Sequence, residues 1–280
     1  MFPIITILAI HNLTSMQRRS FVKSSIIGGA AATIAPAISS AMTKSNPPTT
    51  QEYYELRVYT LKDETQQKLV EDYLKNAAIP ALNRLGVKHI GVFTELKPTG
   101  QTKLYAIAPY HGLDHYASVT DSLGKDEDLK RKGAAYLNAP ATAPAYERIE
   151  SSLLKAFKHF PTLTAPPKKS RIFELRQYQS ASDAAGKKKI EMFNDKGEID
   201  IFKRLGFNPV FWGETIIGPL RPNLTYMVTF DDLADKDSHW KDFVNDTQWH
   251  EISAVPDYAD ALLVSKITST LLVPTEFSQI

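Results

Sequence analysis

The sequence predicts an α+β fold in which two tandem ferredoxin-like units pack their antiparallel sheets face to face as an α/β barrel. Three observations lead to this prediction. The motif Glu-Leu-Arg-x-Tyr occurs twice, at 55–59 and 174–178. Other short matches, such as Arg-Leu-Gly at 84–86 and 204–206, recur at nearly the same spacing. Each half also follows the order β-α-β-β-α-β, which is that of the ferredoxin-like unit.

The first half begins with alternating apolar and polar residues, which predict a strand over 53–61. Apolar residues at helical spacing then predict a helix over 64–85, with Gly86 as its stop signal. Strands are expected at 88–96 and 103–108, a helical, charged stretch at 113–137, and a last strand at 148–157. These elements place the first domain at 51–161.

The second half repeats this order after a linker at 162–170 that contains Pro166-Pro167. Strands are expected at 171–179, 207–217, 224–230 and 261–272, and helices at 183–205 and 236–254. The second domain therefore spans 170–276. In each unit the helices cover one sheet face, and the other face needs a cover. The second copy of the sheet is the natural cover, and this pairing predicts the barrel.

The first 44 residues are expected to be a signal peptide and linker rather than part of the fold. The stretch 17–23, QRRSFVK, precedes an uncharged run rich in Gly and Ala, and small residues up to Ala41 suit a cleavage site. The paired arginines resemble a twin-arginine export signal. Met16 is a candidate for the true start. We expect export to the periplasm or beyond, and no stable membrane anchor after cleavage, because neither apolar run reaches the roughly 20 residues of a spanning helix.

Composition excludes several classes of site and partner. The 280 residues carry 33 basic and 31 acidic side chains, a net charge of +2, which argues against nucleic acid as a main partner. No cysteine is present, so a disulfide framework, a cysteine-ligated metal site and a cysteine nucleophile are excluded. Dinucleotide-binding, P-loop and nucleophile-elbow motifs are also missing from the sequence. No catalytic residue can therefore be assigned from motifs.

The repeated opening strand, the helix that ends in Arg-Leu-Gly and the Trp-containing second helix together resemble the NIPSNAP family. The resemblance covers about residues 52–275, and the export signal is similar to that of exported bacterial members. It implies the dimeric α/β-barrel fold. It implies little about activity, because relatives in the wider superfamily include cofactor-free monooxygenases, haem-dependent enzymes and proteins that only bind small molecules.

The repeated motif supplies the candidate ligand-binding residues. In a strand, alternate side chains share a face, so we expect Leu56 and Val58 to face the helices. The candidates would then face the barrel lumen, where Arg could hold a carboxylate or phosphate and Tyr could donate a hydrogen bond. They are Glu55, Arg57, Tyr59, Glu174, Arg176 and Tyr178. Trp212 is a further candidate, as part of an aromatic pocket. The alternative is purely structural: Glu and Arg neutralise each other in a polar seam.

No cofactor is supported by the sequence. A haem would need a histidine facing a cavity, and no histidine lies in a metal-binding motif. Three functions stay open at this point. The first is small-molecule binding in the barrel lumen, the second is an oxygenase-type enzyme that is cofactor-free or haem-dependent, and the third is a structural module that forms homo-oligomers.

Overall fold

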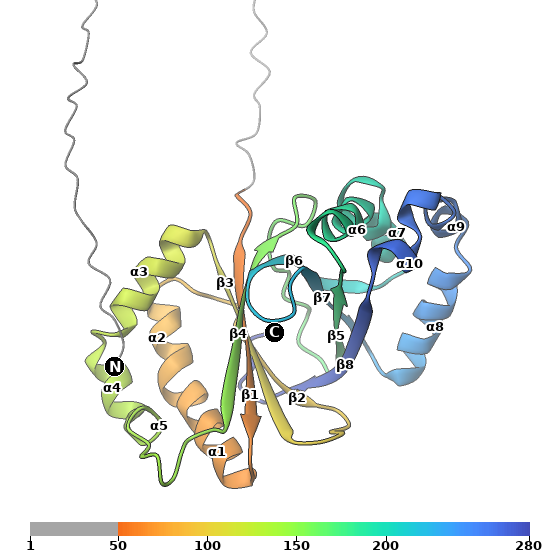
Figure 1. Ribbon diagram of the computed structural model, residues 1–280. Coiled ribbons are helices and arrows are strands. Elements are labelled where there is room, and N and C mark those ends of the chain that lie inside the picture. The colour runs from red at the N-terminus through yellow and green to blue at the C-terminus, as the bar shows by residue number, and fades with distance from the viewer. Residues whose placement is uncertain (1–49) are drawn as a thin grey trace, which may run out of the picture. The chain divides into compact units, whose positions relative to one another are not determined.

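A computed structural model describes residues 50–280, which lie in one compact unit (Figure 1). The predicted export signal and its cleavage site fall outside the described residues. The unit is a β-barrel with helices on its outer side, so the predicted fold class is confirmed.

The barrel closes within a single chain. Around it the strands follow the order β1-β3-β2-β8-β5-β7-β6-β4, and all neighbours are antiparallel. The strands are β1 (Tyr53–Leu61), β2 (Gly91–Glu95), β3 (Thr102–Tyr110), β4 (Arg148–Ala156), β5 (Ile172–Gln179), β6 (Asn208–Ile217), β7 (Asn223–Phe230) and β8 (Lys266–Pro274). Each repeat contributes four neighbouring strands. The repeats meet where β2 pairs with β8, as at Thr94 and Val273, and where β4 pairs with β6, as at Leu154 and Thr215.

Each repeat carries its helices outside its own strands (Figure 1). In the first repeat these are α1 (Glu64–Tyr73), the π-helical turn η1 (Leu74–Ala78), α2 (Ile79–Arg84), α3 (Leu113–Leu123), α4 (Glu127–Lys132) and α5 (Ala134–Leu137). In the second they are α6 (Asp183–Asp195), α7 (Glu198–Arg204), α8 (Leu233–Val244), α9 (Thr247–Ser253), the 3₁₀ turn η2 (Pro256–Tyr258) and α10 (Asp260–Leu263). Several begin at a side-chain cap: Asp63 accepts from the backbone of Gln66, and Ser182 from that of Ala185.

Among the departures from the predicted elements, three change a long helix or the last strand. The helix expected over 64–85 contains the π turn η1 in its middle. The helix expected over 183–205 breaks at Gly197, whose φ of 91° is left-handed and therefore favours glycine. The strand expected over 261–272 starts only at Lys266, because Asp260–Leu263 form the short helix α10.

The core has an apolar layer between the two sheets and one between each sheet and its helices. The barrel interior joins both repeats, with Tyr54, Leu56 and Phe93 packed together with Phe173 and Phe211. The other two layers each belong to one repeat. Apolar packing in the barrel interior therefore helps to hold the two sheets together.

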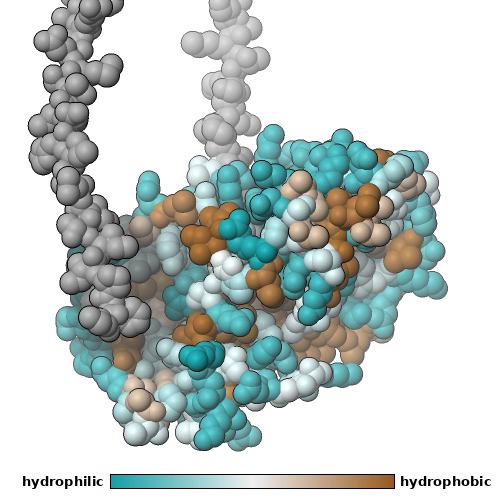
Figure 2. Space-filling model, viewed as in Figure 1, coloured by the Kyte–Doolittle hydropathy of each residue, from teal (hydrophilic) through white to brown (hydrophobic). Residues whose placement is uncertain are grey.

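The face of the molecule in Figure 2 is mixed, with brown apolar atoms in separate groups among teal polar ones. Large apolar side chains that are exposed, such as Ile217 and Leu262, occur at several points of the chain. Among residues 50–280, no helix has both the length and the apolar character needed to cross a membrane.

Candidate functional site

The repeated Glu-x-Arg-x-Tyr side chains face the helices, so the predicted lumenal orientation is wrong. Leu56 belongs to the apolar core of the barrel interior, with Val58 packed against it. Tyr59 and Leu61 pack in the layer between the first sheet and its helices. Arg57 lies on the same face of the strand, because it is two positions from Tyr59. The physical reason is that the two sheets meet through apolar side chains. The polar face of β1 instead borders a cavity on the helix side of the sheet.

A cavity of about 160 Å³ lies between the first sheet and the helices above it. Engineered protein cavities of about 150 Å³ hold a benzene-sized molecule. Its lining combines polar and apolar side chains. They are Glu55, Arg57, Tyr59, Tyr73, Leu74, Ala78, Ile79, Leu82, Ile90, Ala106, Ile107, Ala108, Tyr110, Tyr116, Thr120, Leu123 and Leu129.

Three side chains of β1 form the polar end of this cavity. Arg57 donates from Nε to Oε1 of Glu55 at 2.8 Å, and the hydroxyl of Tyr110 donates to Oε2 of Glu55 at 3.3 Å. The Arg57 side chain is 40% exposed, whereas that of Glu55 is 9% exposed. Within residues 50–280, Arg57 makes its hydrogen bond of good geometry through Nε, and the Tyr59 side chain lies beside the guanidinium without forming a second one. Nη1 and Nη2 therefore stay available to a ligand. The buried hydroxyl of Tyr59 has no partner in this part of the chain either.

The surroundings of Arg57, Tyr110 and Tyr116 keep the protonation state of these three side chains constant over the ordinary pH range. Burial opposes the charge of Arg57, but the neighbouring Glu55 and Tyr59 outweigh it and raise the pKa of the guanidinium. Burial, together with the Glu55 carboxylate, raises the pKa of Tyr110 and Tyr116. Arg57 therefore stays cationic, and these phenols stay protonated as hydrogen-bond donors.

The wall opposite the sheet comes from the irregular helix α1–η1–α2. Leu74 and Ala78, the first and last residues of the π turn, both line the cavity. A π turn accommodates one extra residue in a helix, and such turns are frequent at functional sites. The widened turn thus forms part of the cavity wall.

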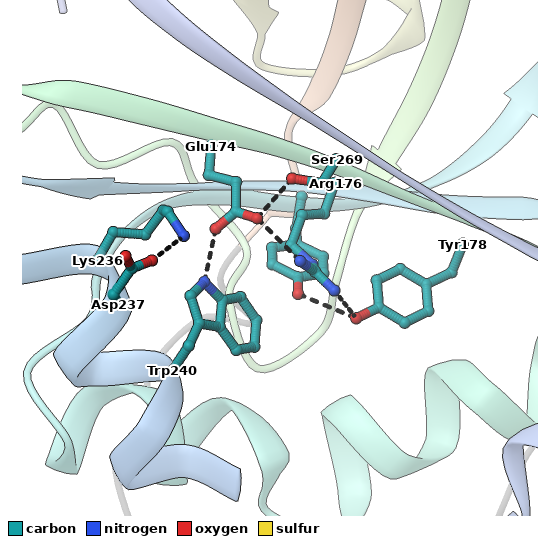
Figure 3. A network of polar contacts seen from close by, with 8 residues as sticks. Glu174, Arg176, Tyr178, Lys236, Asp237, Trp240 and Ser269 are labelled. Atoms are coloured by element: carbon teal, nitrogen blue, oxygen red, sulfur yellow. Dashed lines mark hydrogen bonds and ion pairs between the residues drawn. The ribbon is translucent and has the colours of Figure 1, made fainter. Parts of the chain in front are cut away.

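Both terminal nitrogens of the arginine in the second copy of the motif are bonded within the protein, while its buried Nε has no partner among residues 50–280 (Figure 3). Glu174 accepts from Nη1 of Arg176 at 2.8 Å, from Ser269 at 2.6 Å and from the indole nitrogen of Trp240 at 2.7 Å. Arg176 also donates from Nη2 to the hydroxyl of Tyr178 at 3.0 Å. The Arg176 side chain is 17% exposed, less than half the value for Arg57.

Aromatic rings pack around this second copy. The Trp240 ring lies over the Arg176 guanidinium, with 4.3 Å between the guanidinium carbon and the ring centroid. Tyr226 stacks on Trp212 with centroids 5.6 Å apart, and both side chains are fully buried. Trp212 therefore lies in the helix-facing core of the second repeat and not in the barrel lumen. Its indole nitrogen has no partner within the described residues.

Sequence reasoning missed several lining residues of the first-repeat cavity. Tyr110 and Ala106 lie on β3, and Tyr73 and Tyr116 lie on helices. Register was the missing information: Ala106 pairs with Arg57 across the sheet. Tyr110 shares its face with Ala106, because the two differ by an even number of positions. The sequence of β3 could therefore have identified Ala106 and Tyr110, but only once the face of β1 was assigned correctly.

Histidines lie elsewhere. None of the residues that line this cavity is a histidine, so its walls offer no imidazole ligand for a haem. His115 contacts the carbonyl of Leu85 through Nε2 at 3.0 Å, and His239 contacts that of Asp235 through Nδ1 at 2.8 Å. In the part of the chain that the structure describes, no cluster of three or more His, Cys, Asp or Glu residues could hold a metal ion.

Comparison with known proteins gives one family and a shared fold. The NIPSNAP family model matches residues 54–160 and again residues 173–279. No curated protein matches the chain significantly. A solved NIPSNAP family protein from Agrobacterium tumefaciens is 21% identical and covers 42% of this chain and 97% of its own, with a TM-score of 0.35.

Two solved structures match over most of both chains. A protein named "Putative monooxygenase" from Fusobacterium nucleatum covers 80% of this chain and 93% of its own, at 11% identity and a TM-score of 0.54. A protein of the same name from Lactobacillus acidophilus covers 80% and 94%, at 11% identity and a TM-score of 0.52. At this identity the likeness shows the fold alone.

Proposed function

Because the chain belongs to the NIPSNAP family, which it matches once in each repeat, and because its first repeat encloses a cavity with a polar end, we propose that it binds a small organic molecule there. The cavity lies between the first sheet and its helices. One observation carries the proposal: Arg57 lines the cavity, with 40% of its side chain exposed and two guanidinium nitrogens available. A ligand can therefore reach this half-exposed cation and gain from it, through a hydrogen bond to its nitrogens or through an aromatic ring stacked on its face.

The charge at the polar end favours a neutral ligand. Glu55 neutralises Arg57 at 2.8 Å and lies at the same end of the cavity. An anionic ligand would gain from Arg57 but would also meet this buried carboxylate. A neutral molecule with an apolar body and one polar group fits the lining better, since most of the other lining side chains are apolar or phenolic.

The names of the two fold relatives suggest an oxygenase. Their 11% identity supports the fold and not the chemistry. We therefore propose binding, without a reaction, as the function that the cavity supports.

The two arginines provide a matched experiment. Binding of phenol, cyclohexanol and benzoate is measured by ligand-observed NMR with wild-type protein, Arg57→Met and Arg176→Met. We expect phenol or cyclohexanol to bind wild type and Arg176→Met alike, and Arg57→Met to bind at least about tenfold more weakly, since a hydrogen bond to a charged group is worth about 1.5–3 kcal/mol.

The control lies in the second repeat, where Arg176 already has its own partners. Circular dichroism establishes that each variant is folded. Equal loss of binding in both variants would locate the ligand outside the first-repeat cavity, and no binding of any probe to wild type would overturn the proposal.

A further inference from the structure

The two repeats differ at the position that faces the arginine. Across the sheet, Arg57 pairs with Ala106, whereas Arg176 pairs with Tyr226. On the next strand Ala106 is beside Val92, and Tyr226 is beside Trp212. Two large aromatic rings in the second repeat thus stand where the first repeat has an alanine and a valine.

The helices show the same difference. Counted back from the Arg-Leu-Gly motif, Leu82 corresponds to Phe202, and counted on from the helix caps, Leu74 corresponds to Phe193. Leu74 and Leu82 both line the cavity. Phe193 and Phe202 are buried and pack against Tyr226, with centroids 5.5 and 5.8 Å apart. The second repeat has therefore filled the volume that the first repeat leaves open.

In the second repeat, the Trp240 side chain takes the place beside the Glu-x-Arg pair that a ligand would take in the first repeat. Its ring lies over Arg176 at 4.3 Å, and its N–H donates to Oε2 of Glu174 at 2.7 Å. Figure 3 shows the indole reaching from helix α8 toward the Glu174 and Arg176 side chains. The chain itself thus shows which group satisfies a Glu-x-Arg pair of this geometry: a flat ring that carries an N–H donor.

The first repeat has the same pair without the ring. Within residues 50–280 no aromatic ring lies over the Arg57 guanidinium as Trp240 lies over Arg176. Tyr116, on the corresponding helix α3, packs edge-on against Tyr110 instead, with centroids 5.0 Å apart. Glu55 accepts two hydrogen bonds where Glu174 accepts three, and one of those two is long, at 3.3 Å.

We propose that the ligand of the first repeat is a planar aromatic molecule with a ring N–H or O–H, of the indole or phenol class. It stacks on Arg57 and donates to Glu55, as Trp240 does in the second repeat. Ala106 determines whether the ring can enter, because the corresponding Tyr226 fills this space. This inference rests on the proposed function and names the class of ligand for the same cavity.

Three probes of similar size separate ring shape from hydrogen bonding. Indole carries the planar ring and the N–H, 1-methylindole lacks the N–H, and 5-hydrindanol, a saturated bicyclic alcohol, is a neutral donor without a planar ring. Their affinities for the full chain are measured by isothermal titration calorimetry. Indole is expected to bind at least about tenfold more tightly than 1-methylindole, because its N–H bonds a carboxylate. The saturated alcohol should also bind more weakly than indole, because it cannot stack on the guanidinium.

Variants that copy the second repeat locate the site. Ala106→Tyr should abolish indole binding, and Leu82→Phe serves as a second variant with the same expected loss if the first does not fold. Trp240→Phe is the matched control: it removes the N–H donor to Glu174 in the second repeat and should leave indole affinity unchanged.

The outcomes separate this inference from the proposed function. If all three probes bind equally and Ala106→Tyr blocks them all, the cavity binds ligands but the aromatic-donor class is wrong. If Trp240→Phe alters indole binding while Ala106→Tyr does not, the ring binds in the second repeat and the inference is wrong. If no probe of either experiment binds wild type, both proposals are overturned.

Discussion

At the scale of single residues, the second repeat buries a lysine and a glutamate next to each other, away from the cavity of the first repeat. Lys189 is 1% exposed and Glu198 is 2% exposed, with Nζ and Oε2 3.8 Å apart. Lys189 also pairs with Asp260 at 3.3 Å and lies near the rings of Tyr178 and Trp249. The Oε2 atom of Glu198 has no hydrogen-bond partner within residues 50–280. Burial therefore raises the pKa of Glu198 to about 7, against the lowering effect of Lys189.

This raised pKa predicts a pH-dependent stability. The folded state holds the Glu198 proton up to about pH 7, whereas the unfolded chain releases it near the ordinary value of 4.5. The stabilisation is thus complete below pH 4.5 and is lost as pH rises through 7, by about 3 kcal/mol in all. Glu198→Gln mimics the protonated side chain, so it should match wild type near pH 4.5 and exceed its free energy of unfolding at pH 8.

Urea unfolding of both proteins at several pH values measures this difference, and other titrating groups cancel in the comparison. A constant difference between pH 4.5 and 8 would show that the pKa of Glu198 is the same in the folded and unfolded chains, and would contradict the prediction. A variant less stable than wild type at pH 8 would show that the ion pair with Lys189 outweighs the cost of burial.

The same scale shows where sequence reasoning reached its limit. Alternation placed Glu55, Arg57 and Tyr59 on one face and Leu56 and Val58 on the other, and this grouping is correct. Which face points inward could not be read from one strand, because both faces of a barrel strand are covered. Assigning the polar face to the lumen was wrong, since the lumen is the apolar contact between sheets.

At the scale of elements, the long helices of the two repeats are interrupted in different ways. The first contains the π turn Leu74–Ala78, and the second breaks at Gly197 between α6 and α7. Periodicity predicted one continuous helix in each case, because a single extra residue or one left-handed residue barely disturbs an apolar pattern. The order of strands and helices along each half was predicted from the sequence, and the duplication predicted two such units. The strand pairs that close the barrel could not be inferred from either half alone.

The π turn offers a prediction about the cavity wall. Asn76 is exposed within it, and deleting one residue of a π turn can restore a regular α-helix without rotating the flanking turns. We expect a protein lacking Asn76 to fold with its stability changed by about 1 kcal/mol, which is typical of single changes in proteins. Leu74 and Ala78 would move relative to each other, and indole affinity should fall at least about tenfold.

Calorimetry with indole and thermal unfolding monitor the two properties separately. Deleting Lys196, at the helix break of the second repeat, is the matched control and should leave indole affinity unchanged. Unaltered affinity after deletion of Asn76 would show that the π turn plays no part in shaping the cavity.

At the scale of the whole molecule, the barrel depends on the contact between its two repeats. Leu56, Phe93 and Ile107 of the first repeat are buried against Phe173 and Leu272 of the second. Separated, each repeat would expose this face together with the edges of two strands. Because β8 corresponds to β4 and β6 to β2, the pairs β2–β8 and β4–β6 are related by a pseudo-twofold axis.

This symmetry predicts how the first repeat behaves alone. In a fragment spanning residues 46–163, β2 of one copy can pair with β4 of another, and the reverse pair closes a twofold barrel. We therefore expect a dimer, or aggregation where the two copies fit poorly. A stable monomer is not expected, since each large apolar side chain left exposed costs about 1.5–3 kcal/mol. Light scattering after size-exclusion chromatography gives the mass. Leu56→Lys, which places a charge in the shared interior, should prevent the dimer without touching the helix-facing cavity. A soluble, folded monomer of the unsubstituted fragment would mean that the sheet face is stable in water, and that the contact between the repeats is not what holds the barrel together.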